Sequence, residues 1–190
     1  MIGERFGHFL DKPLAPLAKR VPLSPNVITI SGFIVTVLAA IAIQRSLVAG
    51  GLLILAGGAF DMLDGMVARA SGTSSTFGAF LDSTLDRYAD AVLFLAVAWY
   101  FYTAGNDIGM LLSIGSLAGA FIISYARARA EGLGIDCKVG LLERPERVIL
   151  LALGCLTGLL LTVVTVIFVL SHFTVVQRIV HVKRRLKNNL

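Results

Sequence analysis

The stretch FDMLDGMVARASGTSSTFGAFLDSTLDRYAD, residues 60–90, joins the end of one long apolar run to the start of another. Its five aspartates are Asp61, Asp64, Asp82, Asp86 and Asp90. The first two are three residues apart, and the last three follow one another at intervals of four. Residues three or four apart share one face of a helix. The stretch therefore predicts two helices, linked by residues 70–76, whose acidic faces meet in an antiparallel hairpin.

The composition excludes several classes of protein. The chain has 190 residues, of which 56% are hydrophobic and 15% charged, and its mean hydropathy is +0.82. A soluble domain carries about 25% charged residues, and a single globule of this length cannot bury such an excess of apolar side chains. A soluble enzyme, a disordered chain and a secreted disulfide scaffold are all excluded, which leaves an integral membrane protein.

The apolar runs predict how often the chain crosses the membrane. A spanning helix needs about 20 apolar residues. We expect an all-α, polytopic membrane protein with six transmembrane helices, at residues 26–43, 47–67, 77–104, 109–130, 145–157 and 159–182. Residues 1–22 mix apolar and basic side chains, which predicts a short N-terminal interfacial helix. The chain then divides into this segment and a membrane domain at 23–190.

The distribution of charge predicts an orientation. There are 17 Lys and Arg residues against 12 Asp and Glu, and the net charge is +5. Six spans place both termini on one side, together with every basic residue except Arg45. Because basic loops stay in the cytoplasm, we expect a protein of the cell membrane whose termini and acidic hairpin face the cytoplasm. The expected partners of these basic residues are membrane lipids, and no nucleic acid.

The aspartates are the strongest functional signal. A carboxylate at membrane depth costs several kcal/mol and marks a functional site by default. Protonation, ion pairs with Arg69 and Arg87, or one or two hard divalent cations would each neutralise the cluster. Metal binding is favoured, while ion pairing and a proton or cation pathway stay open. Gly65 and Gly78 leave room beside the helices, and Arg69 offers a fork for phosphate. This combination describes a metal-bridged pyrophosphate.

The pattern Asp61-x2-Asp64-Gly65-x2-Ala68-Arg69-x8-Gly78-x3-Asp82-x3-Asp86 resembles the signature of the CDP-alcohol phosphatidyltransferases. All of its fixed residues are present. The resemblance implies a six-helix membrane enzyme in which two Mg²⁺ ions, or Mn²⁺, are bound by Asp61, Asp64, Asp82 and Asp86. It makes Asp86 the catalytic base as well. The implied CDP-binding residues are Asn26, Gly65, Ala68, Arg69 and Gly78. Asp90 lies outside the signature, and its simplest interpretation is an acid that serves helix packing or supports the neighbouring site residues.

The segment SYARARAEGLGIDCKVGLLERPER, residues 124–147, contains a second charged cluster. As a pattern it is an ordinary basic cytoplasmic loop. However, Ser124 and Arg127 share a helix face, as do Arg144 and Arg147, and Pro145 suits the first turn of a helix. The segment resembles the family branch that uses inositol 1-phosphate. The implied acceptor-phosphate residues are Ser124, Arg127, Arg129, Arg144 and Arg147. A basic residue of the last helix, Arg184 or Arg185, would join them.

Together these resemblances imply a phospholipid-synthesising transferase that acts as a homodimer. It would move a phosphatidyl or archaetidyl group from CDP-diacylglycerol or CDP-archaeol to inositol 1-phosphate and release CMP. Glycerol 3-phosphate is the alternative acceptor, because it also carries a phosphate. A cation transporter that uses the aspartate stripe and a catalytically silent membrane partner are the alternatives outside the enzymes.

Overall fold

The computed structural model describes residues 23–188, which form six helices and no strand. The helices are α2 (Pro25–Ile43), α3 (Leu47–Ser71), α4 (Thr76–Thr103), α5 (Asp107–Glu131), α6 (Arg144–Thr157) and α7 (Leu160–Asn188). Each corresponds to one predicted apolar run, so the all-helical prediction is confirmed over this part of the chain. The predicted interfacial helix at 1–22 lies outside the described residues.

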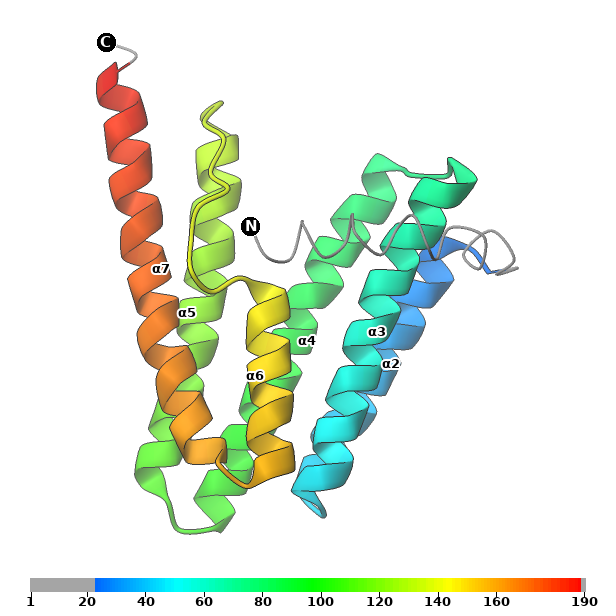
Figure 1. The fold of residues 1–190 in the computed structure, drawn as a ribbon, viewed down its shortest axis with the longest axis vertical. Coiled ribbons are helices and arrows are strands. Elements are labelled where there is room, and N and C mark those ends of the chain that lie inside the picture. Colours follow the sequence, from blue (N-terminus) through cyan, green and yellow to red (C-terminus); the bar gives the residue numbers. More distant parts are fainter. Residues whose placement is uncertain (1–22, 189–190) are drawn as a thin grey trace.

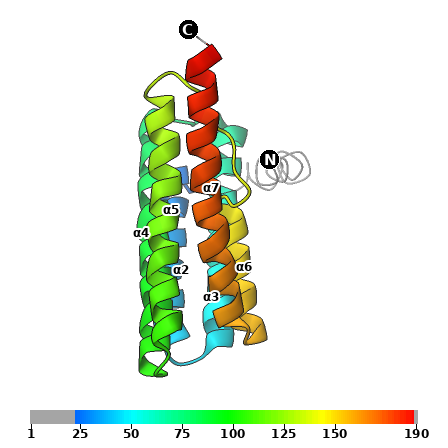
Figure 2. The ribbon, with the colours of Figure 1, turned by 90° about the vertical axis from the view of Figure 1, so that its left-hand side faces the viewer.

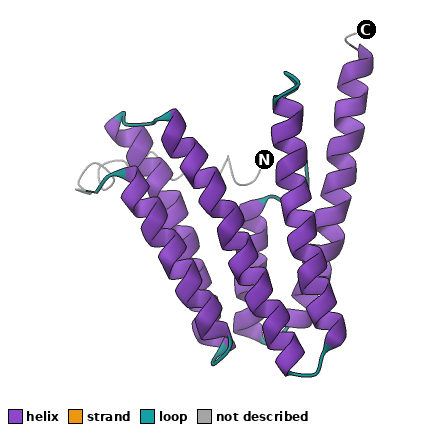
Figure 3. Cartoon of the chain, turned by 180° about the vertical axis from the view of Figure 1, so that it is seen from behind, coloured by secondary structure: helices purple, strands orange, loops and turns teal. Residues whose placement is uncertain are grey.

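The six helices form a bundle of two layers. Figure 2 shows α2, α4 and α5 in one layer and α3, α6 and α7 in the other. The principal contacts follow a closed ring, in the order α2, α3, α6, α7, α5, α4 and back to α2. The main apolar core contains Ile43, Ile54, Phe94 and Ile167, and it lies toward the end of the bundle that holds the 43–47 loop. Toward the opposite end the helices diverge (Figures 1 and 3).

Polar caps and glycines set several of the helix ends. Ser46, Ser75 and Asn106 each accept a hydrogen bond from the backbone N–H three residues further on, at 2.8–3.3 Å. Such a cap pairs one of the N–H groups that a helix start leaves without a partner. Gly72 and Gly158 end α3 and α6 with φ of 67° and 74°, a left-handed conformation that glycine adopts without strain.

Helix α6 differs from the others because it begins partway down the bundle (Figure 1). The chain leaves α5 at the diverging end, and residues 132–143 descend along α7 before α6 starts. The backbone N–H groups of Leu141 and Leu142 donate to Gln177 and Thr174 of α7, at 3.1 and 3.2 Å. Non-helical backbone at membrane depth must have its polar groups paired within the protein. These bonds therefore allow the descent that brings Arg144 into the bundle.

Four of the described helices are long and apolar enough to cross a membrane: α2, α3, α5 and residues Leu160–Lys187 of α7. The chain is thus a multi-pass membrane protein. Helix α4 has 28 residues but carries three aspartates and an arginine. Helix α6 has 14 residues and spans about 21 Å, less than the hydrocarbon thickness of about 30 Å. Four of the six predicted spans thus correspond to helices that meet these criteria, and the crossing by all six helices stays a prediction.

Glycines bring α2 and α3 close together. A Cβ atom on Gly57 would lie 2.6 Å from Thr36 Oγ1, and one on Gly32 would lie 2.8 Å from Phe60 Cβ. Small residues of this kind let helix backbones approach closely in membranes. The close approach also brings Thr29 to Asp64, whose Oδ2 accepts a hydrogen bond of 2.6 Å from Thr29 Oγ1. Helix packing therefore helps to place an acidic side chain.

Two neighbouring glycines of α3 give a matched test of this packing. Both gain the same helix propensity on substitution by alanine, but a Cβ on Gly58 would meet only a Val148 methyl group at 3.4 Å. Overpacking costs about 1–3 kcal/mol. We expect Gly57→Ala to lower the free energy of unfolding in detergent by that amount relative to Gly58→Ala. Equal unfolding temperatures for the two variants would contradict this account.

Candidate active site

A first cavity opens between the start of α2, the end of α3 and the start of α4. It has a volume of about 220 Å³. Its lining residues are Pro25, Asn26, Thr29, Asp64, Gly65, Ala68, Arg69, Thr73, Ser74, Ser75, Gly78, Ala79 and Asp82. All the residues predicted to contact CDP are among them: Asn26, Gly65, Ala68, Arg69 and Gly78. Helical spacing on α3 and α4 brings them together as the signature implied.

The two glycines keep this cavity open. A Cβ atom on Gly65 would lie 3.1 Å from Nη1 of Arg69. One on Gly78 would lie 3.0 Å from Ser75 Oγ and 3.2 Å from Asn26 Oδ1. Any larger residue would therefore press on the polar groups that line the cavity, whereas glycine leaves them room for a ligand.

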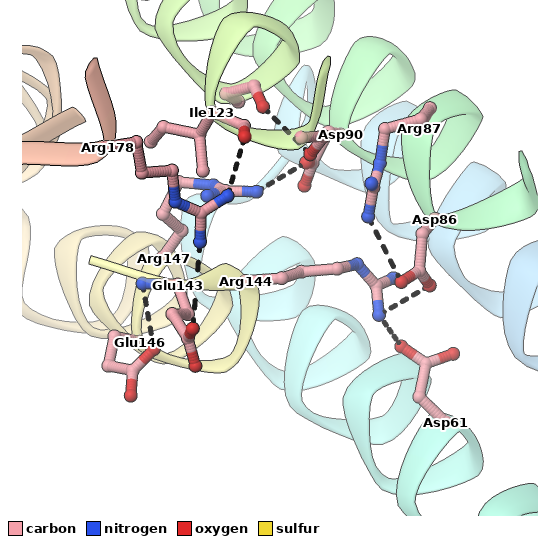
Figure 4. Close-up of polar contacts among 12 residues, drawn as sticks. Asp61, Asp86, Arg87, Asp90, Ile123, Glu143, Arg144, Glu146, Arg147 and Arg178 are labelled. Atoms are coloured by element: carbon pink, nitrogen blue, oxygen red, sulfur yellow. Dashed lines mark hydrogen bonds and ion pairs between the residues drawn. The ribbon is translucent and has the colours of Figure 1, made fainter. Parts of the chain in front are cut away.

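The four aspartates of the signature converge from α3 and α4. Asp61 and Asp86 share one cation: Nη1 of Arg144 lies 2.5 Å from Asp61 Oδ2 and 2.7 Å from Asp86 Oδ1 (Figure 4). Asp82 interacts electrostatically with Asp61 and Asp64. The hairpin predicted from the spacing thus brings the carboxylates into one cluster.

The ion pairs of this cluster differ in part from the prediction. Arg87 contacts Asp86 at 3.3 Å, as the sequence suggested. Asp61, however, pairs with Arg144, which lies 83 residues away in the sequence. This pairing was not anticipated, because helical spacing carries no information about contacts between distant segments.

The donor set fits a hard divalent cation. As the described side chains stand, no three His, Cys, Asp or Glu residues are arranged to hold a metal ion, since Arg144 contacts two of the candidate ligands. The cluster nevertheless offers carboxylate oxygens from two adjacent helices, with the Thr29 hydroxyl beside Asp64. Oxygen donors of this kind suit Mg²⁺ and Mn²⁺. The residues therefore match such ions in chemistry.

A second cavity, of about 390 Å³, has Asp86 in its wall. It is lined by Ser83, Asp86, Arg87, Ile123, Ser124, Arg127, Ala128, Glu131, Glu143, Arg144, Pro145, Arg147 and Arg178. It includes four of the five predicted acceptor residues, namely Ser124, Arg127, Arg144 and Arg147. The carboxylate cluster thus borders both cavities, because Asp64 and Asp82 line the first and Asp86 lines the second.

The fifth predicted residue, Arg129, lies elsewhere. It lines a separate, mostly apolar groove between α5 and α7, together with Lys183. Successive residues of a helix are about 100° apart, so Arg129 points away from Arg127, two positions earlier. The structure does not bring it into the second cavity.

The basic residue that α7 contributes to the second cavity is Arg178, which the sequence analysis missed. Its side chain is 3% exposed. Its Nη1 donates to the carbonyl of Ile123 at 2.6 Å (Figure 4), and its Nε to that of Val139 at 2.9 Å. Arg184 and Arg185, the predicted candidates, are exposed. The missed signal was a lone arginine inside the last apolar run, which marks function as strongly as the aspartates do.

The carboxylate cluster borders a polar cavity with glycines in its wall and a second cavity rich in arginine, and all three lie inside a membrane bundle. Such a site is suited to an enzyme that acts on phosphate esters. A sequence model of the CDP-alcohol phosphatidyltransferase family matches residues 22–182. The chain belongs to this family and is an enzyme of this class, which confirms the resemblance stated above.

Curated relatives cover almost the whole chain. An archaetidylinositol phosphate synthase of Methanothermobacter thermautotrophicus is 40% identical, over 96% of this chain and 95% of the relative. A synthase of the same name from Pyrococcus horikoshii is 38% identical, over 94% and 91%.

Solved structures share the fold. The phosphatidylinositol phosphate synthase of Mycobacterium tuberculosis with CDP-DAG bound superposes with a TM-score of 0.79 at 33% identity, over 90% of this chain and 92% of that one. The same enzyme in complex with manganese and citrate gives a TM-score of 0.80 at 32% identity, over 90% and 88%.

The contacts of Arg178 predict a structural effect of its loss. Arg178→Met would leave the buried carbonyl of Ile123 and the partly buried carbonyl of Val139 without these donors. The cost is about 1–3 kcal/mol for the buried group and less for the other. We expect a lower unfolding temperature and faster proteolysis within residues 132–143. Arg185→Met is the control, because Arg185 is exposed and exposed charges contribute little to stability. Equal proteolysis of both variants would contradict the prediction.

Proposed function

We propose that this enzyme transfers a phosphatidyl or archaetidyl group from a CDP-linked lipid to inositol 1-phosphate and releases CMP. One observation carries the choice of acceptor. Five arginines, Arg87, Arg127, Arg144, Arg147 and Arg178, line the second cavity beside Asp86. Arginine binds phosphate through paired hydrogen bonds, so this cavity suits an alcohol that itself carries a phosphate. The names of the M. thermautotrophicus and P. horikoshii relatives support the same acceptor.

The first cavity is proposed to hold the CDP part of the lipid donor, either CDP-diacylglycerol or CDP-archaeol. The guanidinium of Arg69 would contact the pyrophosphate, and Asn26 would contact the nucleotide. Gly65, Ala68 and Gly78 would leave room for the ligand beside the helix backbones. The solved relative that has CDP-DAG bound supports this assignment.

Asp61, Asp64, Asp82 and Asp86 are the proposed ligands of two Mg²⁺ ions, with Mn²⁺ as the alternative. Their oxygen donors support this choice, and so does the relative solved in complex with manganese. When bound, such ions neutralise the charge that develops on the pyrophosphate oxygens and on the leaving group. Arg144, which contacts Asp61 and Asp86 in this structure, would be available to a phosphate when those carboxylates hold the ions.

The position of Asp86 supports its role as the general base. It is the one signature aspartate that lines the second cavity, so its carboxylate is placed to accept the proton of the acceptor hydroxyl. The arginines would hold the acceptor phosphate and fix the direction of that hydroxyl. Its oxygen would then attack the phosphorus nearest the lipid, and the bond to CMP would break. The protein thus contributes orientation, charge and a proton acceptor.

We propose that the active site and both termini face the cytoplasm of a plasma-membrane protein, and that the protein is a homodimer. The orientation is supported by the position of Arg45. It lies in the 43–47 loop, at the end of the bundle opposite the 71–76 loop (Figure 1). The other basic residues of the described helices and loops lie on the site's side or within the bundle. The dimer is proposed from the family resemblance.

A release assay for CMP tests the proposal. The purified protein is supplied with CDP-diacylglycerol or CDP-archaeol and Mg²⁺, and inositol 1-phosphate is compared with glycerol 3-phosphate. Turnover with inositol 1-phosphate alone is the expected result. Turnover with glycerol 3-phosphate alone would support the proposed transfer reaction but contradict inositol 1-phosphate as the acceptor. No CMP release with either acceptor and either lipid would contradict the proposed function.

Replacing the proposed base should remove most of the activity. General-base catalysis contributes about 10²–10⁴-fold to a rate, so we expect Asp86→Asn to lower kcat by at least about 10²-fold. Asp107→Asn is the matched control, because Asp107 is exposed at the opposite end of the bundle. Substantial CMP release by Asp86→Asn would indicate that Asp86 has a role in helix packing and is not the general base.

A side chain that narrows the first cavity should weaken the binding of the lipid donor but not the binding of the acceptor. In Gly65→Ala the new methyl group lies 3.1 Å from the Arg69 guanidinium, which must move. We expect KM for the CDP-lipid to rise about tenfold, a loss of about 1.4 kcal/mol, while KM for the acceptor stays the same. Steady-state kinetics with each substrate varied in turn provide the measurement. An equal rise in both KM values would argue against two separate binding regions.

A further inference from the structure

The buried pair between Asp90 and Arg147 is not accounted for by the signature or by the proposed base and metal ligands. Nη2 of Arg147 donates to Oδ2 of Asp90 at 2.7 Å (Figure 4). The two side chains are 2% and 3% exposed for Arg147 and Asp90, so the bond lies in the dry interior. It joins α4 to α6, which belong to different layers of the bundle.

Arg147 keeps hydrogen-bonding capacity that the protein does not use. Its Nε and Nη1 atoms are buried and have no hydrogen-bond partner among the described residues. Arg147 also lines the second cavity. Unpaired donors on a buried charge are costly, and an oxyanion in that cavity would satisfy them.

The neighbouring arginines have other partners. Arg144 contacts Asp61 and Asp86, and Arg178 holds two backbone carbonyls. The carboxylate of Asp90 is thus the acid that compensates the charge of Arg147 and fixes one end of its guanidinium. Without it, Arg147 would be a buried cation among other cations, because Asp86 already pairs with Arg87 and Arg144, and Glu143 lies 3.7 Å from Arg178.

We propose that Asp90 is a positioning residue, which holds Arg147 so that its unused donors bind the acceptor phosphate. This inference rests on the proposed function, because it takes the second cavity as the acceptor site. It extends the functional residues of α4 one helical turn beyond the signature, from Asp86 to Asp90. Asp90 itself would not touch the substrate.

The main test separates positioning from a structural role. Asp90→Asn keeps the shape of the side chain but removes its charge. We expect KM for inositol 1-phosphate to rise about tenfold or more, while KM for the CDP-lipid is unchanged and kcat falls much less. A purely structural role would lower the unfolding temperature and the amount of active enzyme, but would leave KM for the acceptor as it is. That result would overturn the inference.

A double variant covers the case in which Asp90→Asn does not fold. Removing one partner of a buried ion pair is strongly destabilising, whereas replacing both by apolar residues is often tolerated. We expect Asp90→Leu with Arg147→Met to fold and to raise KM for inositol 1-phosphate about tenfold or more over wild type, since the two residues act as one unit. A wild-type KM in the double variant would contradict the inference.

Calorimetric titration with inorganic phosphate distinguishes this inference from the proposed function. Wild-type protein should bind phosphate about tenfold or more tightly than Asp90→Asn, whichever acceptor supports turnover. Phosphate could bind more weakly to the variant while inositol 1-phosphate fails as a substrate. This result would contradict the proposed acceptor but support the role of Asp90. Equal phosphate binding in both proteins would overturn that role even if inositol 1-phosphate is used.

Discussion

The contact of Arg144 with Asp61 and Asp86 is the constraint on which the arrangement of the bundle depends. A carboxylate pair inside a membrane protein needs a compensating charge, and this one comes from a distant part of the chain. To deliver it, α6 must begin within the bundle rather than at its end. The preceding segment must therefore descend as non-helical backbone, and α7 must pair its polar groups through Thr174, Gln177 and Arg178. One ion-pair cluster thus accounts for the short helix, the re-entrant loop and the buried arginine.

One end of the bundle contributes mainly to stability, and the other end contains the candidate active site. Apolar side chains such as Phe94 and Ile167 fill the end near the 43–47 loop, where dense packing provides the rigidity. Toward the other end the helices diverge (Figure 3), and the space between them is lined by charged groups and glycines. Charged side chains could not be tolerated there without partners. The packed half therefore supports a polar half that would be unstable by itself.

Local spacing predicted part of the site, and the remaining part depends on long-range geometry. The residues of the first cavity lie on two consecutive helices and on the start of α2, so helical periodicity and the signature were enough to group them. The second cavity draws on α4, α5, α6 and α7. Which of the basic residues at 124–147 face it depends on how deep the loop descends and on helix rotation. For that reason the sequence grouped Arg127 and Arg129 together, whereas Arg127 lines this cavity and Arg129 lines a separate groove. Arg178 was missed in favour of the more conspicuous basic run that contains Arg184.

The arrangement of buried charges argues for a binding site rather than a stabilising network. Replacing a buried ion pair by apolar residues often costs nothing or even stabilises a protein, so stability alone does not explain Asp90 and Arg147. A network built for stability would also satisfy every donor, yet Nε and Nη1 of Arg147 and Nε of Arg144 have no partner among the described residues. These unsatisfied donors surround one cavity and belong to cations. An anion that enters the cavity would pair these donors, and this links the cost of the site to its affinity for phosphate.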